Sequence, residues 1–394
     1  MSAPVLVINC GSSSIKYQLV DGDTEEASTS GVIERIGQSE SVVTHTTDDG
    51  KRVWNEHVAD HAAGLEAMVR ACEEFGTPLS DAGLIAVAHR VVHGGERFVQ
   101  PVVIDDEVVD AIEELAVLAP LHNPGNLEGI RVARRLFPEL PQVAVFDTAF
   151  HTTMPERAHV YAVPEEWRKR HGVRRYGFHG TSHAYVSRKA AEMLGKDPKQ
   201  VNVIVAHLGN GASITAVERG RSIDTSMGLT PLEGLVMGTR SGDIDPAIVF
   251  HMHRSTGASF DELDEALNKR SGMLAMTGVI DMRGIDRAAR SGDRAAELAL
   301  EIYCYRLRKY IGSYIAALGG ADAIAFTAGV GENSAEVRAR ALEPLTALGV
   351  KLDESANQAG GPIISTSDSL ITAMVVPTDE EGEIAAQTAS LLRS

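Results

Sequence analysis

Two segments of this chain, nearly half its length apart, follow the same pattern of residues. The apolar run Val5–Ile8 leads into NCGSSSIK, and the run Val203–Ala206 leads into HLGNGASI. Each segment predicts a buried β-strand, a tight turn and a second strand. The turn glycines Gly11 and Gly209 lie 198 residues apart and the following Ser-Ile pairs 199 apart, so we expect one extra residue in the second turn.

Turns of small residues leave backbone N–H groups unhindered, as the binding of a polyphosphate requires. A third glycine turn is expected at Gly329–Gly331. One such turn alone is more often an ordinary hairpin, but three of them, two related by repetition, favour a ligand site. Neither a G-x-x-x-x-G-K-[ST] nor a G-x-G-x-x-G motif occurs, so these turns alone predict that the chain binds phosphate groups. The repeat therefore predicts a duplicated fold that closes around a nucleotide.

Strands alternate with helical patterns along the chain, which predicts an α/β fold. Because 394 residues are too many for one core, we expect two domains, one of residues 1–149 with 382–394 and one of residues 150–381. The pattern over 294–318 predicts a core helix that buries Leu298, Ile302, Tyr305, Ile311, Ile315 and Leu318. Further strands are expected at 84–92, 142–146, 202–207, 213–218, 323–326 and 373–376, and further helices at 62–75, 107–118, 126–137 and 182–194.

The composition, with 44% hydrophobic and 23% charged residues, is that of a globular protein. A formal net charge of -17 disfavours a nucleic-acid partner, and a binder of anions with this charge must gather a few cations locally. Lys16, Arg90, Arg240 and Arg283 are the candidates. Three cysteines give no disulfide framework, and no signal peptide or uninterrupted membrane span is visible, so we expect a cytoplasmic protein without a membrane partner.

Two arginines and two carboxylates have positions that favour chemistry. Arg90, in HRVVHGG, can bind a carboxylate or phosphate through two N–H groups, although a structural ion pair is about equally plausible. Arg240, flanked by glycines in GTRSG, has little to pack against, which favours a functional role. Asp147 and Glu380 follow strand ends, where carboxylates bind metals or act as bases; for Glu380 a solvated helix start is the alternative.

Histidines suggest a metal site that we disfavour. His179 and His183 are four residues apart and His251 and His253 two apart, but neither pair comes with the third and fourth ligands that zinc requires. Ser182 resembles a nucleophile elbow without its second glycine, so we expect it to be the N-cap of the following helix.

A series of segments resembles, in order and over the whole chain, the motif series of acetate kinases. These segments are VINCGSSSIK, HRVVHGGE, APLHNPGN, FDTAFH, RRYGFHGTSH, AHLGNGASI, MGTRSGDIDP, TAGVGENS and VPTDEE. This resemblance implies the duplicated, ribonuclease-H-like βββαβαβα core of actin, Hsp70 and sugar kinases. It also implies reversible phosphoryl transfer between ATP and acetate, giving ADP and acetyl phosphate, with Mg²⁺ or Mn²⁺, in a homodimer.

The resemblance also implies roles for single residues. Asp147, His179 and Arg240 would be catalytic, Arg90 and His122 would bind acetate, and Asn9 and Glu380 would hold the metal. The acyl methyl group would be enclosed by Val92, Leu121, Phe178 and Pro231. ATP would contact Ser12, Ser14, Lys16, His207, Leu208, Gly209, Asn210, Gly211, Asp281, Met282, Arg283, Gly329, Val330, Gly331, Glu332 and Asn333. Relatives often carry another residue at Met282.

Phosphoryl transfer needs charge neutralisation and alignment more than covalent chemistry. Acetate, whose acidity is similar to that of a Glu side chain with a pKa of roughly 4.3, is already ionised at pH 7 and needs no base. We therefore expect Asp147 to orient Mg²⁺ or arginine side chains. A propionate or butyrate kinase is the alternative within the class, and a nucleotide-gated binding module like the chaperones is the alternative outside it.

Overall fold

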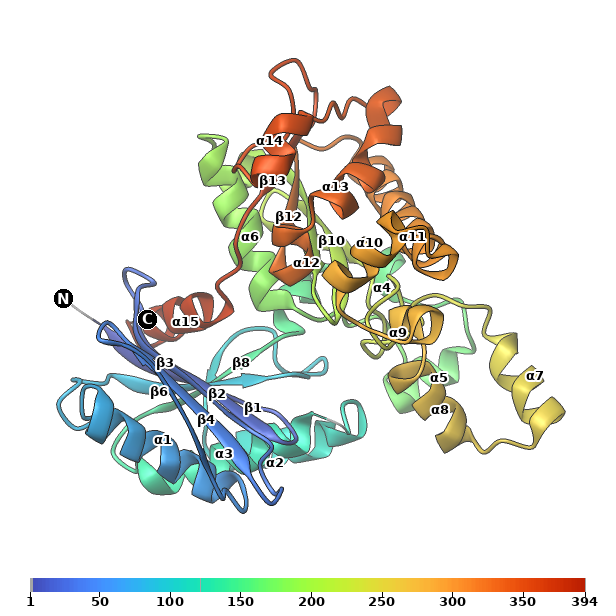
Figure 1. Cartoon of the computed structure of the whole chain (residues 1–394). Coiled ribbons are helices and arrows are strands. Elements are labelled where there is room, and N and C mark those ends of the chain that lie inside the picture. The colour runs from blue at the N-terminus through green and yellow to red at the C-terminus, as the bar shows by residue number, and fades with distance from the viewer. Residues whose placement is uncertain (1–2, 121, 394) are drawn as a thin grey trace. The chain divides into compact units, whose positions relative to one another are not determined.

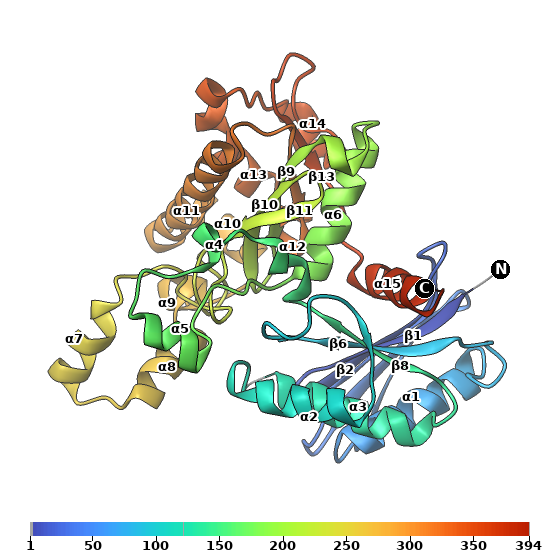
Figure 2. The same ribbon diagram turned by 180° about the vertical axis from the view of Figure 1, so that it is seen from behind.

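The structure, a computed structural model, describes residues 3–120 and 122–393 and divides into two compact units, each with its own β-sheet (Figures 1 and 2). Unit 1 comprises Met1–Thr152 and Asp379–Ser394, and unit 2 comprises Thr153–Thr378. The sequence analysis puts the corresponding boundaries after residue 149 and before residue 382.

The sheet of unit 1 has eight strands in the order β5-β4-β3-β2-β1-β6-β8-β7. β1 (Pro4–Cys10) is antiparallel to β2 (Ser14–Asp21) and parallel to β6 (Ala86–Val91), which is parallel to β8 (Gln142–Phe146). The remaining strands are β3 (Ala27–Glu34), β4 (Ser41–Thr47), β5 (Gly50–Glu56) and β7 (Val102–Val103).

Helices cover both faces of this sheet because β1 is apolar on both sides. Successive side chains of a strand point to opposite faces. Leu6 and Ile8 pack in a cluster with residues of α1 (His61–Phe75) and α3 (Asn123–Leu136), whereas Val5 and Val7 pack with Ile384 and Ala385 of the C-terminal helix α15 (Glu380–Arg393). Figures 1 and 2 show α15 on the face of the sheet opposite to α1 and α3. Burying a side chain such as Ile384 contributes about 1.5–3 kcal/mol.

The sheet of unit 2 repeats the central part of the first sheet. Its order β11-β10-β9-β12-β13 corresponds to β3-β2-β1-β6-β8, with the same pattern of antiparallel and parallel pairs. The predicted duplicated α/β core is therefore confirmed. The strands are β9 (Asn202–Leu208), β10 (Ala212–Glu218), β11 (Arg221–Thr225), β12 (Ala323–Thr327) and β13 (Thr372–Val375).

The two repeated turns differ in length in the opposite sense to the prediction. Cys10 pairs with Ile15, which leaves four residues in the first turn, and Leu208 pairs with Ala212, which leaves three in the second. The Ser-Ile spacing gave the wrong difference in turn length because Ile15 and Ile214 occupy different positions in the two strand pairs.

Helix α11 (Arg294–Leu318) begins and ends as predicted and buries the predicted Ile311 and Leu318, but its first half buries a different face. Leu298, Ile302 and Tyr305 are 41%, 36% and 58% exposed. The helix has apolar residues around most of its circumference, so spacing alone did not identify the face on the sheet. The buried side chains are those of Ala296, Ala299, Leu300, Tyr303, Cys304, Leu307, Ile311, Tyr314 and Leu318.

The other helices are short. Among the described residues, none of the helices has the length and apolar character needed to cross a membrane. Helix α6 (Gly180–Met193) packs on one face of the second sheet and α11 on the other (Figures 1 and 2). The remaining helices are α2 (Asp106–Glu114), α4 (Glu156–His159), α5 (Glu165–His171), α7 (Ala247–Thr256), α8 (Phe260–Lys269), α9 (Gly272–Thr277), α10 (Met282–Arg290), α12 (Ala328–Asn333), α13 (Ala335–Leu342) and α14 (Glu354–Ala359), with 3₁₀ turns at 115–117, 149–153, 198–200 and 343–348.

Candidate active site

In unit 1, Arg90 and Asp147 form a bidentate ion pair. They lie at the carboxyl ends of the neighbouring parallel strands β6 and β8, so the sheet itself brings them together. Arg90 Nε donates to Asp147 Oδ1 at 2.9 Å, and Nη2 donates to Oδ2 at 2.6 Å. Glu380, the first residue of α15, lies on the same guanidinium, with Oε2 3.5 Å from Arg90 Nη2.

This group carries more negative than positive charge. Burial alone would lower the pKa of Arg90, but Asp147, and then Glu380, outweigh it and hold that pKa above its ordinary value. Burial and the neighbouring Glu380 raise the pKa of Glu381, while Lys16 and Arg90 oppose the rise. With Glu381 and Lys16 the group holds three carboxylates and two cations, a negative balance that favours a further cation.

Asn9 and Glu380 have the donor chemistry for that cation. Asn9 is the second-last residue of β1 and pairs with Lys16 of β2, and the N-terminal end of α15 carries Glu380. Mg²⁺ prefers oxygen ligands and usually takes one or two protein carboxylates together with substrate phosphates and water. The amide oxygen of Asn9 and the carboxylate of Glu380 therefore fit Mg²⁺. Ser12 lies exposed in the turn and Ser14 half-buried at the start of β2.

The segment that carries Val92 is held by two asparagines at the start of α3. Asn126 Oδ1 accepts from Val92 N at 3.1 Å, and Asn123 Oδ1 accepts from His93 N at 3.1 Å. Val92 is buried, and His122, at the N-cap of α3, is half-buried. Leu121, predicted for the acyl pocket, lies outside the described residues.

In unit 2, the second repeated turn lies beside Arg240 and His179. A Cβ built on Gly211 would lie 3.1 Å from Arg240 Nη2 and 3.6 Å from His179 Nε2. Arg240 Nη1 donates to the carbonyl of Pro231 at 2.7 Å. Burial lowers the pKa of Arg240, and no carboxylate among the described residues forms an ion pair with it. Arg240 is thus a cation whose charge the described residues do not neutralise, next to a turn of backbone N–H groups.

His179 is held in a strained conformation by its neighbours. It is the N-cap of α6 with φ 57°, in the left-handed region that residues other than glycine rarely adopt. Its ring stacks on His207 with centroids 4.2 Å apart, and its Nδ1 lies 2.9 Å from Ser213 Oγ. Such strain persists only where surrounding contacts impose it, and it is frequent at functional sites.

Ser182 is not the N-cap that the sequence predicts. Helix α6 begins at Gly180, so Ser182 lies inside it, and the prediction is wrong. Its Oγ lies 2.7 Å from His207 Nδ1 and 2.8 Å from Thr378 Oγ1. The hydroxyl therefore orients the ring on which His179 stacks.

A cavity of about 1020 Å³ lies within unit 2, beside the turn. This volume is at the upper end of the range typical of pockets for small ligands. It gathers residues far apart in the sequence that were predicted to bind ATP: Gly209, Asn210, Asp281, Met282, Arg283, Gly329, Val330 and Asn333. Ile280, Met273 and Tyr303 add apolar and aromatic surface.

Other predicted ATP residues lie elsewhere. Leu208 and Gly331 are buried, and His207 is held by Ser182. Glu332 Oε1 accepts from Ala328 N at 2.8 Å and Thr378 N at 3.2 Å, a structural arrangement. The glycine turn expected at Gly329–Gly331 is wrong, because these residues form helix α12 directly after β12.

The two remaining predicted acyl-pocket residues belong to unit 2. Phe178 is 2% exposed and immediately precedes His179. Pro231 is half-buried and accepts the hydrogen bond from Arg240 described above.

Two residues that organise this part of unit 2 were not predicted from the sequence. Ser213 Oγ lies 2.7 Å from His183 Nε2 in addition to its contact with His179, and its place in the repeated motif was an available signal. Arg338 is buried and donates to the carbonyls of Gly331 and Glu332 at 2.9 and 2.8 Å. An arginine in a helical pattern looks exposed, so nothing in the sequence pointed to it.

Within the described part of the chain, no cluster of three or more His, Cys, Asp or Glu residues is placed to hold a metal ion. His179 and His183 instead share the hydroxyl of Ser213.

Comparison with solved structures agrees with this fold. The chain is similar to an acetate kinase from Porphyromonas gingivalis, with a TM-score of 0.94 and 43% identity over 99% of this chain and 100% of that one. It is equally similar to a propionate kinase from Francisella tularensis, with a TM-score of 0.93 and 44% identity over 98% of both chains. The duplicated core and its turns thus define a kinase fold of the actin and sugar-kinase type.

The family follows from the sequence comparisons. The family model of the acetokinase family matches residues 4–386. An acetate kinase from Leifsonia xyli subsp. xyli is 55% identical over 390 residues, which are 98% of each chain. The chain belongs to the acetokinase family.

Proposed function

We propose that this chain is an acetate kinase, which transfers the γ-phosphoryl group of ATP directly to acetate and forms acetyl phosphate and ADP, reversibly. The curated relatives named acetate kinase, such as the one from Leifsonia xyli at 55% identity, support this activity.

The observation that carries the proposal is the position of Arg240. Its guanidinium has no ion-pair partner among the described residues and lies next to the backbone of Gly211, as does the ring of His179. The turn that contains Gly211 also contains Gly209, which lines the large cavity. A phosphoryl group in flight gathers negative charge on its equatorial oxygens. Donors fixed in advance stabilise that charge without reorganisation. Arg240 and His179 would supply such donors, and the cavity would hold the nucleoside.

Arg90 would bind the carboxylate of acetate. Its guanidinium is fixed in the plane of Asp147 by two hydrogen bonds, so its remaining N–H groups have a defined direction. Because acetate is already ionised at neutral pH, no proton has to be removed from it. Asp147 would therefore orient Arg90 and would not act as a base.

Mg²⁺ would be held by Asn9 and Glu380 together with phosphate oxygens of ATP. When bound, it neutralises charge on the phosphates. Removal of divalent ions with a chelator is expected to abolish activity, and Mg²⁺ or Mn²⁺ to restore it.

Propionate kinase is the second candidate, because the propionate kinase from Francisella tularensis is about as similar to this chain as the acetate kinase from Porphyromonas gingivalis. Phe178 and Pro231 would form walls of the acyl pocket. One methylene changes binding in an apolar pocket by only about 1–3 kcal/mol. We expect propionate to be used, but less well than acetate.

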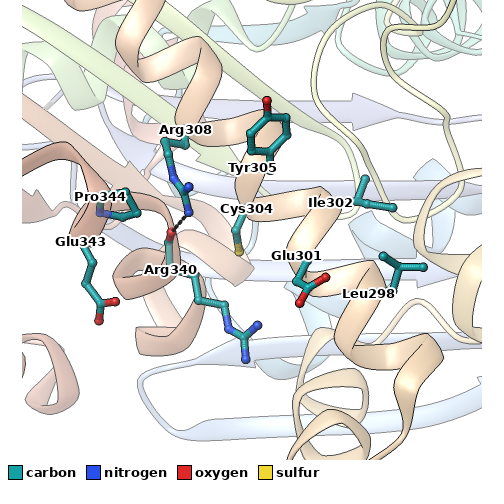
Figure 3. A pocket seen from close by; sticks show the side chains of 9 residues that line it. All are labelled: Leu298, Glu301, Ile302, Cys304, Tyr305, Arg308, Arg340, Glu343 and Pro344. Atoms are coloured by element: carbon teal, nitrogen blue, oxygen red, sulfur yellow. Dashed lines mark hydrogen bonds between the residues drawn. The ribbon is translucent and has the colours of Figure 1, made fainter.

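We further propose a cytoplasmic homodimer that uses the exposed face of α11. Figure 3 shows Leu298, Ile302 and Tyr305 projecting from this helix around a pocket of about 450 Å³. Apolar side chains gathered on one surface favour a protein partner. Sedimentation should find a dimer for the parent chain and a monomer for Tyr305→Asp; a parent chain that sediments as a monomer would exclude this part.

The test of the activity is an acyl-hydroxamate assay with ATP, Mg²⁺ and acetate, propionate or butyrate. Acetate should give the highest kcat/KM. A higher value for propionate or butyrate would assign the chain to that substrate. Hydrolysis of ATP that does not depend on any acid would instead favour a nucleotide-gated binding module.

A further inference from the structure

The segment between β11 and α7 carries Pro231 and Arg240 and forms neither helix nor strand over residues 226–246. A segment without its own ladder of hydrogen bonds takes its course from side chains that hold its backbone. Two such side chains, Tyr161 and Arg175, lie together with the carboxylate of Glu233, which belongs to the segment, and we call these three residues of unit 2 the Tyr161 clamp.

The Tyr161 clamp binds the segment at several points. The Tyr161 hydroxyl donates to the carboxylate of Glu233 and accepts from the backbone N–H of Leu229 at 3.2 Å. Arg175 Nη2 donates to Glu233 Oε1 at 2.6 Å, and its Nη1 donates to the carbonyl of Thr225 at 2.7 Å. One hydroxyl therefore holds both ends of the stretch 229–233.

Pro231 is the middle residue of that stretch. Its carbonyl accepts the hydrogen bond from Arg240 Nη1 at 2.7 Å, while Arg240 Nη2 lies beside Gly211. The position of one carbonyl thus fixes the direction in which the second nitrogen of Arg240 points. A shift of the stretch would rotate the guanidinium away from the turn.

Two members of the clamp, Tyr161 and Arg175, keep their protons at neutral pH. Burial raises the pKa of Tyr161; Arg175 opposes this rise and Glu233 adds to it, so the hydroxyl keeps its proton. Burial alone would lower the pKa of Arg175, but Glu233, together with Tyr161, Tyr314 and Asp224, outweighs burial and raises that pKa.

We propose that the Tyr161 clamp is a positioning element for Arg240, in which Tyr161 and Glu233 set the carbonyl of Pro231 and that carbonyl sets the guanidinium. The proposal rests on the phosphotransferase function proposed above. The clamp residues would touch neither substrate and would act only through Arg240.

The first experiment is Tyr161→Phe, which removes one hydroxyl and keeps the ring. Misplacing a group near the reacting atoms by about 1 Å costs on the order of 100-fold in rate. We expect kcat to fall about 10- to 100-fold while KM for ATP changes less than about two-fold. Tyr17→Phe is the control: its hydroxyl makes a similar buried hydrogen bond, 2.7 Å from His45 Nδ1, in unit 1. That variant should keep the parental kcat.

The second experiment repeats the change in an Arg240→Ala background. If the clamp acts through Arg240, Tyr161→Phe should then lower kcat less than about two-fold, because coupled residues are not additive. Glu233→Gln, which keeps the shape of the side chain, should behave in the same way. An equal fold-loss with and without Arg240, or a Tyr161→Phe enzyme with parental kcat, would overturn the proposal. A parent chain inactive with every acid would instead refute the proposed function.

Discussion

Gly211→Ala tests whether the space beside Arg240 and His179 belongs to the transferring phosphoryl group. The backbone of Gly211 is not in the left-handed region, so alanine adds no conformational strain there. Its methyl group, however, would lie 3.1 Å from Arg240 Nη2, whereas ordinary contacts lie at 3.4–4 Å. Arg240 must therefore move by about 0.3 Å, the difference between these two distances.

The size of the effect follows from this geometry. If about 1 Å of misplacement costs about 100-fold, a shift of about 0.3 Å costs about four-fold. The methyl group also takes space that a phosphoryl oxygen would use, and so we expect kcat to fall about 10- to 100-fold in total. Stability should change little, because replacing glycine restricts the unfolded chain by about 0.4–1 kcal/mol and offsets the close contact.

The assay is steady-state formation of acyl hydroxamate, together with thermal unfolding of each variant. Gly312→Ala is the matched control, because a Cβ there meets nothing within 4 Å inside helix α11. It should leave kcat unchanged and stabilise the protein by roughly 0.5–1 kcal/mol. A Gly211→Ala enzyme with kcat within two-fold of the parent would refute the reasoning, as would a loss explained by its unfolded fraction.

Asp147→Asn should raise KM for acetate and lower kcat/KM roughly 30-fold or more, because Arg90 loses a buried charged partner. If the pH–rate profile of this variant instead loses only one deprotonation limb while its metal affinity is kept, Asp147 acts as a base. Propionate should show a kcat/KM about 10- to 200-fold below that of acetate, and equal values would contradict an acyl pocket fitted to a methyl group. Burial lowers the pKa of His89 from 6.5 to about 4, although Gln142 opposes the shift, so the neutral ring stabilises the fold above pH 6.5. That stabilisation, about 3 kcal/mol, should be lost as the pH falls from 6.5 to 4, and His89→Gln should show a smaller fall in Tm over this range.

The parts of the fold with a strong local pattern were predictable from sequence. β1 with β2 and β9 with β10 were visible because an apolar run of β-branched residues ends in a small-residue turn. The proximity of Arg90 and Asp147 was implicit in the pattern, since Arg90 lies near the end of β6, Asp147 directly follows β8, and these two strands pair in parallel. Sheet geometry therefore carries information about side chains 57 residues apart.

Other parts depend on contacts that no local pattern records. Tertiary packing around irregular segments produces three such features. They are the left-handed backbone of His179, the place of Ser182 inside α6 and the hydrogen bond from Arg240 to Pro231. Arg338 and the exposed face of α11 were missed for a related reason. Helical periodicity indicates that a face exists but not which neighbour covers it.

The placement of α15 makes completion of unit 1 depend on a segment that is synthesised after unit 2. Val5 and Val7 leave the ribosome long before Ile384 and Ala385, which cover them. At roughly 5–20 residues per second, all of unit 2 is synthesised in the interval, which lasts on the order of tens of seconds. During that time an apolar surface of the sheet stays accessible to chaperones, and a nascent chain that stalls before α15 is made would keep that surface exposed.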